Sequence, residues 1–192
     1  MTKLLPGKVV NKSVINLLSL LTLLSLLWLA LPATAKTPKG YEATTEDCRT
    51  GSTQHIWSDG HGHLRSETTV AGKNYVTIMD LNTKTNYAIN DEARTITQVP
   101  LSEPASAQWQ PIGNKVIEGH PCQGKRTTQG RIVMETWTGD DTDCAVLITT
   151  NGSPMQKLKS WSAANPSPSL FALPAGYKTV DIGAMMKGIH PY

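Results

Sequence analysis

Alternating apolar and polar positions, broken by short turns, are the main pattern of residues 41–150. No window of this region keeps apolar residues at the i, i+3, i+4 and i+7 positions of an amphipathic helix. Turn residues separate the alternating runs, and the Asp59-Gly60 pair is a strong signal for a hairpin. Because short loops join neighbouring strands that run in opposite directions, the pattern predicts a mainly β protein with antiparallel neighbours.

The turn residues divide the chain into a series of short predicted strands. These are residues 48–57, 64–70, 75–79, 85–89, 95–99, 115–117, 122–128, 131–138, 144–150, 155–161 and 177–182. A segment rich in proline, serine and alanine at residues 100–111 interrupts the series, and a short helix at 103–109 is its one predicted element. The Asn-Pro-Ser-Pro sequence at residues 165–168 excludes regular structure. Residues 183–192 are predicted to form a tail.

The N-terminal region has the three parts of a secretory signal peptide. Three lysines precede an apolar run at residues 14–31, which ends at Pro32 and an A-x-A triplet. This pattern predicts that residues 1–35 are removed by cleavage after Ala35, which places the mature chain in the periplasm or outside the cell. A retained membrane anchor is the alternative, because the run is about as long as the ~18 residues that a spanning helix needs.

The charge balance limits the kinds of partner that this chain attracts. The whole chain has 18 basic and 15 acidic residues, and three of the basic residues lie in the predicted signal peptide. Residues 36–192 are therefore neutral overall, which argues against nucleic acid or an anionic membrane as an electrostatic partner. Their length suits one domain, predicted at residues 36–182.

The three cysteines are Cys48, Cys122 and Cys144, which permit three pairings and leave one thiol over. We favour a disulfide between Cys122 and Cys144, because export makes oxidation plausible and a short loop closure is readily met in a β-meander. Their spacing fits no zinc motif.

Four side chains with metal-binding atoms surround the first predicted hairpin. They are His55, Asp59, His61 and His63. If the turn is tight, the last two histidines share one face of the sheet and His55 approaches from the partner strand. Such a set could hold copper or zinc, and the alternative is that these are solvated turn residues.

The sequence contains no motif of known catalytic chemistry. There is no G-x-S-x-G elbow, no H-E-x-x-H sequence and no P-loop. We therefore predict that the chain is not an enzyme and that it uses no cofactor other than the metal considered above.

Several short segments resemble the LolA-like periplasmic proteins, the group of the outer-membrane lipoprotein-sorting type. They are residues 57–67, residues 76–81 followed by Lys84 and Tyr87, residues 117–122, residues 135–137, and the closing stretch at residues 170–177. The resemblance implies an unclosed, strongly curved antiparallel sheet, or half-barrel, with few short helices. It also implies a concave side that is lined with apolar residues and carries lipid or lipoprotein acyl chains.

The alternating aliphatic residues supply candidates to line such a concave side. They are Val76, Ile78, Ile89, Ile96, Ile132, Met134, Val146 and Ile148, with Trp137 and Phe171 at the rim. The alternative is that these side chains pack against one another, as alternating aliphatics do in any sheet.

Together these observations predict an exported, non-enzymatic carrier of an apolar or amphiphilic, lipid-like ligand. Two other functions stay open: a metal-binding protein built on the histidine hairpin, and a structural envelope protein that takes no small ligand. The carrier hypothesis rests on fold analogy, and a fold by itself does not define a function.

Overall fold

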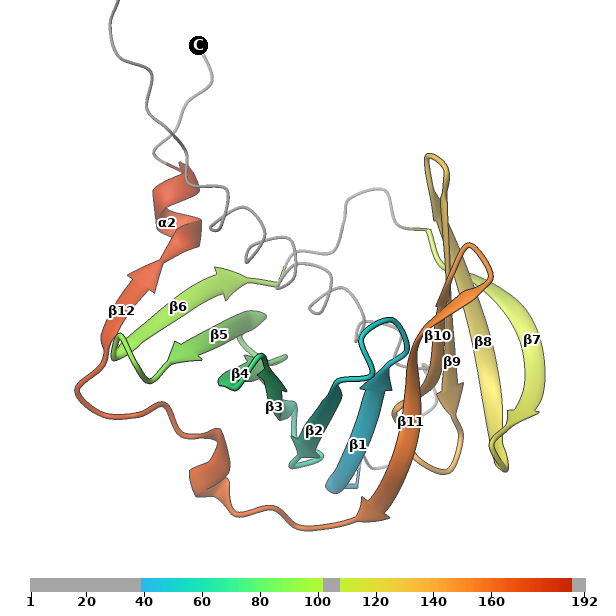
Figure 1. The fold of residues 1–192 in the computed structure, drawn as a ribbon, viewed down its shortest axis with the longest axis horizontal. Helices are drawn as coiled ribbons and strands as arrows, with labels where there is room; N and C mark the ends of the chain where they lie inside the picture. Colours follow the sequence, from blue (N-terminus) through green and yellow to red (C-terminus); the bar gives the residue numbers. More distant parts are fainter. Residues whose placement is uncertain (1–38, 102–107, 188–192) are drawn as a thin grey trace, which may run out of the picture.

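Twelve β-strands form one strongly curved, unclosed sheet in the computed structural model, which describes residues 39–101 and 108–187 (Figure 1). The first six are β1 (Tyr41–Asp47), β2 (Thr53–Ser58), β3 (His63–Val70), β4 (Lys73–Asp80), β5 (Thr85–Asn90) and β6 (Thr95–Pro100). The others are β7 (Gln110–Ile117), β8 (His120–Gln129), β9 (Ile132–Gly139), β10 (Ala145–Thr150), β11 (Ser153–Ala163) and β12 (Lys178–Asp181). The prediction of a mainly β, curved and unclosed sheet is confirmed.

Two meanders meet in the middle of this sheet. The spatial order is β12-β6-β5-β4-β3-β2-β1-β11-β10-β9-β8-β7. The first meander runs from β1 outwards to β6, and the second starts at the far edge with β7 and returns to β11. The antiparallel pair of β1 and β11 joins the two meanders, with a β-bulge between Thr44 and Thr45. Figure 1 shows that the two ends of the sheet face each other across the curve.

The strand β1 was not predicted, and the predicted strand 48–57 is wrong in its first half. The chain turns at residues 48–52, where the Asp47 carboxylate accepts hydrogen bonds from the backbone N–H groups of Arg49 and Thr50. Such an Asx turn competes with strand pairing, because the side chain satisfies the backbone donors locally. The strand therefore resumes only at Thr53.

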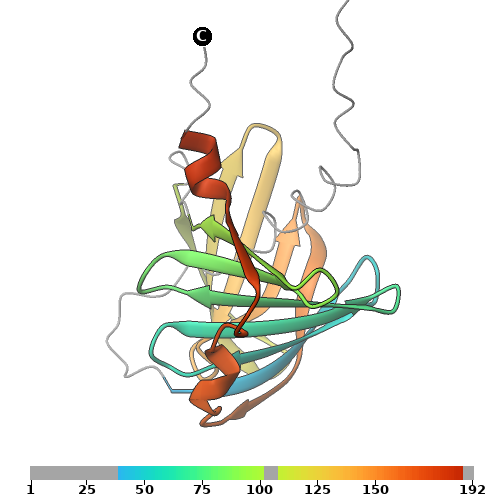
Figure 2. The ribbon, with the colours of Figure 1, turned by 90° about the vertical axis from the view of Figure 1, so that its left-hand side faces the viewer.

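The connection from β11 to β12 runs around the outside of the curve (Figures 1 and 2). It carries a short 3-10 helix, η1 (Pro168–Phe171), and leads into β12, which pairs parallel with β6. The predicted strand at residues 177–182 is thus present, but its partner and its parallel direction were not foreseen. The second meander and this connection separate β6 from β12 in the chain, which provides the crossover that a parallel pair requires.

Two side-chain hydrogen bonds hold this connection against the sheet, one on the convex face and one at the turn between β5 and β6. The Arg65 guanidinium donates to the backbone carbonyl of Leu170 at 3.0 Å, and the Tyr177 hydroxyl donates to the Asp91 carboxylate at 2.9 Å. After β12, the chain forms α2 (Ile182–Lys187), which contacts β6 within the segment predicted as a tail.

Three expectations fall wholly or mostly outside the described residues. They are the signal peptide at residues 1–35, its cleavage site, and the helix predicted at 103–109. Neither helix within residues 39–101 and 108–187 has the length and apolar character needed to cross a membrane.

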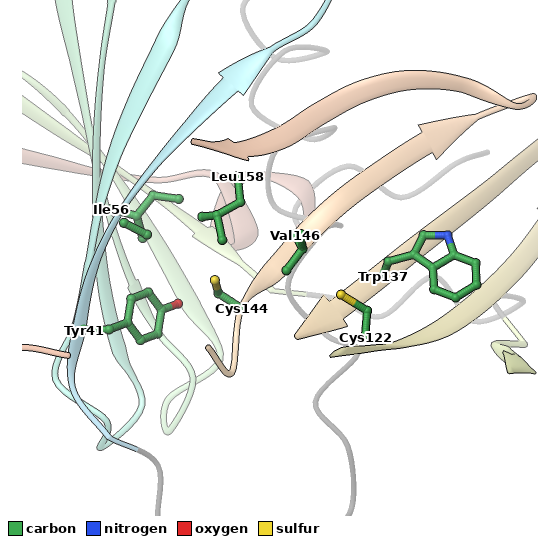
Figure 3. Close-up of a cluster of buried hydrophobic side chains, with 8 residues drawn as sticks. Tyr41, Ile56, Cys122, Trp137, Cys144, Val146 and Leu158 are labelled. Atoms are coloured by element: carbon green, nitrogen blue, oxygen red, sulfur yellow. The ribbon is translucent and has the colours of Figure 1, made fainter. Parts of the chain in front are cut away.

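Buried apolar side chains gather in two clusters. The first contains Tyr41, Ala43, Ile56, Cys122, Trp137, Cys144, Val146 and Leu158 (Figure 3). The second contains Val76, Ile78 and Ile89, with Tyr87 and Tyr177 packed against it. Ala43 pairs with Ile56, Ile56 with Ser66, and Ser66 with Thr77, so these residues share one face of the sheet. Val76 and Ile78 are the neighbours of Thr77 in β4. Since neighbouring residues in a strand point to opposite faces, the second cluster lies on the face opposite Ala43 and Ile56.

Candidate functional site

The concave face of the sheet is the surface that no described helix covers (Figure 1). We use this name for the side chains that share the face of Ala43 and Ile56, opposite the face that carries Tyr177 and the η1 connection. Strand pairing continues this face from β1 through β11 and β10 to β9 and β8. The concave face is therefore one surface that spans both meanders.

This face mixes aliphatic groups with hydroxyl and amide groups. Its buried apolar members include Tyr41, Ile56, Leu64, Met79, Ile148 and Leu158. Its buried polar members include Thr45, Ser58, Asn86, Thr127 and Thr136. A face built only to pack against itself would contain few such polar groups, because burying a polar group without a hydrogen bond is unfavourable.

Three of these buried polar side chains have an atom without a hydrogen-bond partner among the described residues. They are Asn86 Oδ1 on β5, Thr127 Oγ1 on β8 and Thr136 Oγ1 on β9. The three residues are 5%, 7% and 2% exposed, so water does not reach these atoms freely. Each unsatisfied group costs roughly 1–3 kcal/mol in the free protein. Since β5 and β8–β9 lie in opposite arms of the sheet, the unsatisfied atoms are spread over both arms (Figure 1).

The predicted lining residues are divided between the two faces. Val76, Ile78, Ile89 and Ile96 were expected on the concave side and instead share the convex face. There Tyr177 covers the cluster, and Ile78 is 2% exposed. Alternation identified these residues as facing one way, but it does not say which of two faces becomes concave.

Other predicted lining residues do lie on the concave face. Met134 and Ile148 align with this face through Thr136 and Gln156. Val146 lies at the irregularity between Ala145 and Leu147, where it has no register partner in β9, and it is fully buried in the first cluster. Ile132 follows the same alternation at the end of its hairpin, where it is 52% exposed.

The two predicted rim residues occupy different places. Trp137 follows Thr136 directly in β9, so it points to the opposite face, where Lys115 Nζ lies 3.8 Å from the centre of its ring. Phe171 belongs to η1 on the convex side, and its ring centre lies 6.1 Å from that of His63. Phe171 therefore does not border the concave face, whereas Trp137 is buried in the cluster that also contains Tyr41 and Ile56.

The predicted Cys122–Cys144 disulfide is absent, and all three cysteines are free thiols. Cys122 pairs with Gly139 of β9 from one side, and the carbonyl of Cys144 accepts the N–H of Gly139 from the other. A strand therefore separates the two cysteines, which puts their Cα atoms roughly two strand spacings, or about 9.6 Å, apart. A disulfide requires less than about 7 Å. Burial raises the pKa of Cys144 to about 12, and Figure 3 shows both sulfur atoms in the buried cluster.

The predicted metal cluster is also not assembled. His55 lies three residues before the end of β2, pairs with Glu67 and stacks on Trp57 with ring centres 4.0 Å apart. His63 instead contacts Asp59, with 2.6 Å between Nδ1 and Oδ2. The strand carries His55 about 10 Å away from the turn. Within residues 39–101 and 108–187, no three His, Cys, Asp or Glu side chains are grouped so as to hold a metal ion.

Asp59 organises the turn between β2 and β3. One oxygen of its carboxylate accepts the backbone N–H groups of His61 at 2.7 Å and His63 at 3.0 Å. Burial alone would raise the pKa of Asp59, but these hydrogen bonds and the His63 ring outweigh burial and lower the pKa. The residue therefore has a structural role in the turn.

Replacing this carboxyl group should remove part of the acid sensitivity of the fold. A group whose pKa is lower in the folded state stabilises the fold above its unfolded pKa, about 3.9, and this stabilisation disappears as the pH falls through the folded pKa. We expect Asp59→Asn to cost about 1 kcal/mol at pH 7 and progressively less below about pH 4. Urea unfolding at several pH values measures this difference. An equal loss at every pH would show that charge is not the cause.

Sequence reasoning missed Lys125, Thr127 and Thr136, which the structure places together on the concave face. They lie in the predicted strands 122–128 and 131–138, where a lysine or threonine is an ordinary residue for an exposed face. No sequence signal marks them, because their burial depends on how the whole sheet curves.

Comparison with known proteins supports the fold and gives no family. No family model and no curated protein sequence matches this chain. Among solved structures, an uncharacterised conserved protein from Thermus thermophilus overlaps with a TM-score of 0.57 at 12% identity, covering 75% of this chain and 91% of that one. PNGF-II, in its C2 crystal form, gives a TM-score of 0.51 at 15% identity.

The overlap with PNGF-II is partial: it covers 78% of this chain and 32% of PNGF-II. The structure of MucB in complex with MucA(peri) gives a TM-score of 0.45 at 16% identity, over 74% of this chain and 57% of that one, which is too low to establish a shared fold. The first two likenesses show that this sheet architecture occurs in other proteins.

Proposed function

We propose that this chain is an exported, non-enzymatic carrier that binds an amphiphilic, lipid-like molecule on its concave face. The observation that carries the proposal is the combination on one face of buried aliphatic side chains with buried polar atoms that have no partner among the described residues. A purely apolar ligand would leave those polar atoms unsatisfied, and a purely polar ligand would gain nothing from the aliphatic ones. An amphiphile satisfies both kinds of group.

The energetics of the face favour such a ligand. Each methylene group that it covers contributes about 0.8 kcal/mol to binding. Hydrogen bonds from the ligand to Asn86, Thr127 or Thr136 would also recover the desolvation cost that these side chains bear in the free protein. The unclosed sheet supports the proposal, because it is the architecture that the LolA-like resemblance implies.

The proposed location follows from the N-terminal sequence. A cleaved signal peptide at residues 1–35 would deliver the domain to the periplasm or to the medium. An exported carrier with a neutral mature chain would meet its ligand through the concave face rather than through a charged surface.

A charged residue on the concave face should strongly weaken binding of an amphiphile. Met134 is a half-buried member of this face, so Met134→Glu places an unpaired carboxylate against the ligand. We expect at least tenfold weaker binding of a fluorescent 16-carbon fatty acid. Val133→Glu is the matched control, because Val133 is half-buried on the same strand and points to the opposite face. Circular dichroism must show that both variants are folded.

The same titration decides between the remaining functions. Binding by the wild type that is at least tenfold weaker in Met134→Glu and unchanged in Val133→Glu supports the carrier on this face. Failure of the folded wild type to bind the fatty acid and other amphiphiles would overturn the proposal and leave a structural envelope protein.

A further inference from the structure

Lys125 is the one cationic side chain of β7–β11 that lies on the concave face. In β8 it pairs with Thr136 of β9 and is half-buried. The neighbouring Arg126 points to the other face, where it forms an ion pair with Glu135. Lys157 and Lys159 of β11 both form ion pairs with Glu46 of β1. In contrast, Lys125 forms no ion pair with any residue within the described ranges.

The two unsatisfied threonines are neighbours of Lys125 in the sheet. Thr136 is directly opposite Lys125 across the β8–β9 pair, and Thr127 is two residues further along β8 on the same face. Directly paired residues have Cβ atoms about 4.5–5.5 Å apart, and diagonal neighbours remain within reach of a long side chain. Lys125 and two threonines whose hydroxyl groups have no partner among the described residues therefore share one part of the face.

The charge of the surroundings favours an anion in this place. Glu135 is the one acidic residue in the strands β7 to β11, and it points to the opposite face against Arg126. Aliphatic side chains continue the concave face from the same point, since Met134 pairs with Thr127 and Ile148 pairs with Thr136. A cationic, hydroxyl-rich patch thus borders an apolar one.

We propose that Lys125, Thr127 and Thr136 form a subsite for the anionic head group of the amphiphile, a carboxylate or a phosphate. Met134 and Ile148 then contact the first methylene groups of its chain. This inference rests on the proposed carrier function and adds the chemical class of the head group. Hydrogen bonds between charged and polar partners are the stronger kind, so the subsite would supply selectivity for charge as well as affinity.

Competition for the bound fluorescent fatty acid tests the subsite. The competitors are palmitate, hexadecyl phosphate and methyl palmitate, which share a 16-carbon chain and differ in charge. We expect the wild type to bind one of the anions about tenfold more tightly than the neutral ester. Lys125→Met should remove this preference by weakening the anions about tenfold, and leave the ester unchanged. The tighter of the two anions identifies the head group.

Lys115→Met is the matched control. Lys115 is in the adjacent strand β7 and covers Trp137 on the opposite face, and methionine retains an apolar stem at that position. This variant should keep the preference for the anion. Equal binding of acid and ester by the wild type, or an equal loss of both in Lys125→Met, would overturn the subsite while the carrier function stands. Absence of binding by any of the three lipids would overturn the carrier function itself.

Discussion

Ile78→Ala should lower the free energy of unfolding by about 2–5 kcal/mol, the range for deleting a large aliphatic side chain from a packed interior. Ile78 is 2% exposed on the convex face, in the cluster that Tyr87 and Tyr177 complete. A loss of this size is a large part of the roughly 5–15 kcal/mol that stabilises an ordinary domain. The substitution leaves a cavity that the surrounding structure should not fill, because hydrogen bonds from Arg65 and Tyr177 hold the η1 connection in place.

Urea unfolding of Ile78→Ala and Met134→Ala measures the contrast between the two faces. Met134 is half-buried on the concave face, so its truncation should cost clearly less than that of Ile78. Below the urea concentrations that unfold it, Ile78→Ala should bind the fluorescent fatty acid as the wild type does. Normal stability together with lost binding in Ile78→Ala would show that the convex face holds the ligand after all.

The local structure of this chain was largely predictable from its sequence, because alternation and turn residues act over a few positions. The predicted strands 75–79 and 131–138, for example, lie within β4 and, apart from Arg131, within β9. The strand β1 was missed because its buried positions, Tyr41, Ala43 and Thr45, include no aliphatic residue larger than alanine. Its place in the sheet depends on pairing with β11, which lies far away in the sequence.

The candidate site was predictable only in part, for a geometric reason. Period-two alternation assigns side chains to two faces, whereas curvature decides which face is concave. Ile78 and Met134 therefore looked equivalent in the sequence and lie on opposite faces in the structure. The cysteine prediction failed because a short separation in the sequence does not show the order of strands in the sheet. Cys122 and Cys144 are close in the sequence, but the strand β9 lies between them.

Replacing Thr127 and Thr136 together by valine should raise stability by roughly 2–4 kcal/mol and weaken binding of the amphiphile. Valine keeps the branched shape of threonine and removes a hydroxyl group that is buried without a partner among the described residues. If these hydroxyl groups had a purely structural role, their removal would instead lower the free energy of unfolding. Stability gained together with affinity lost is thus the mark of groups kept for a ligand rather than for folding.

Thr142→Val supplies the matched control for this double variant. Thr142 is as deeply buried, but its hydroxyl donates to the carbonyl of Cys144 and accepts the N–H of the same residue. Its replacement should therefore cost about 1 kcal/mol and leave binding unchanged. Urea unfolding and titration with the fluorescent fatty acid give both quantities for each variant. If the double valine variant were less stable than the wild type, or more stable with its affinity intact, Thr127 and Thr136 would have no part in holding a ligand.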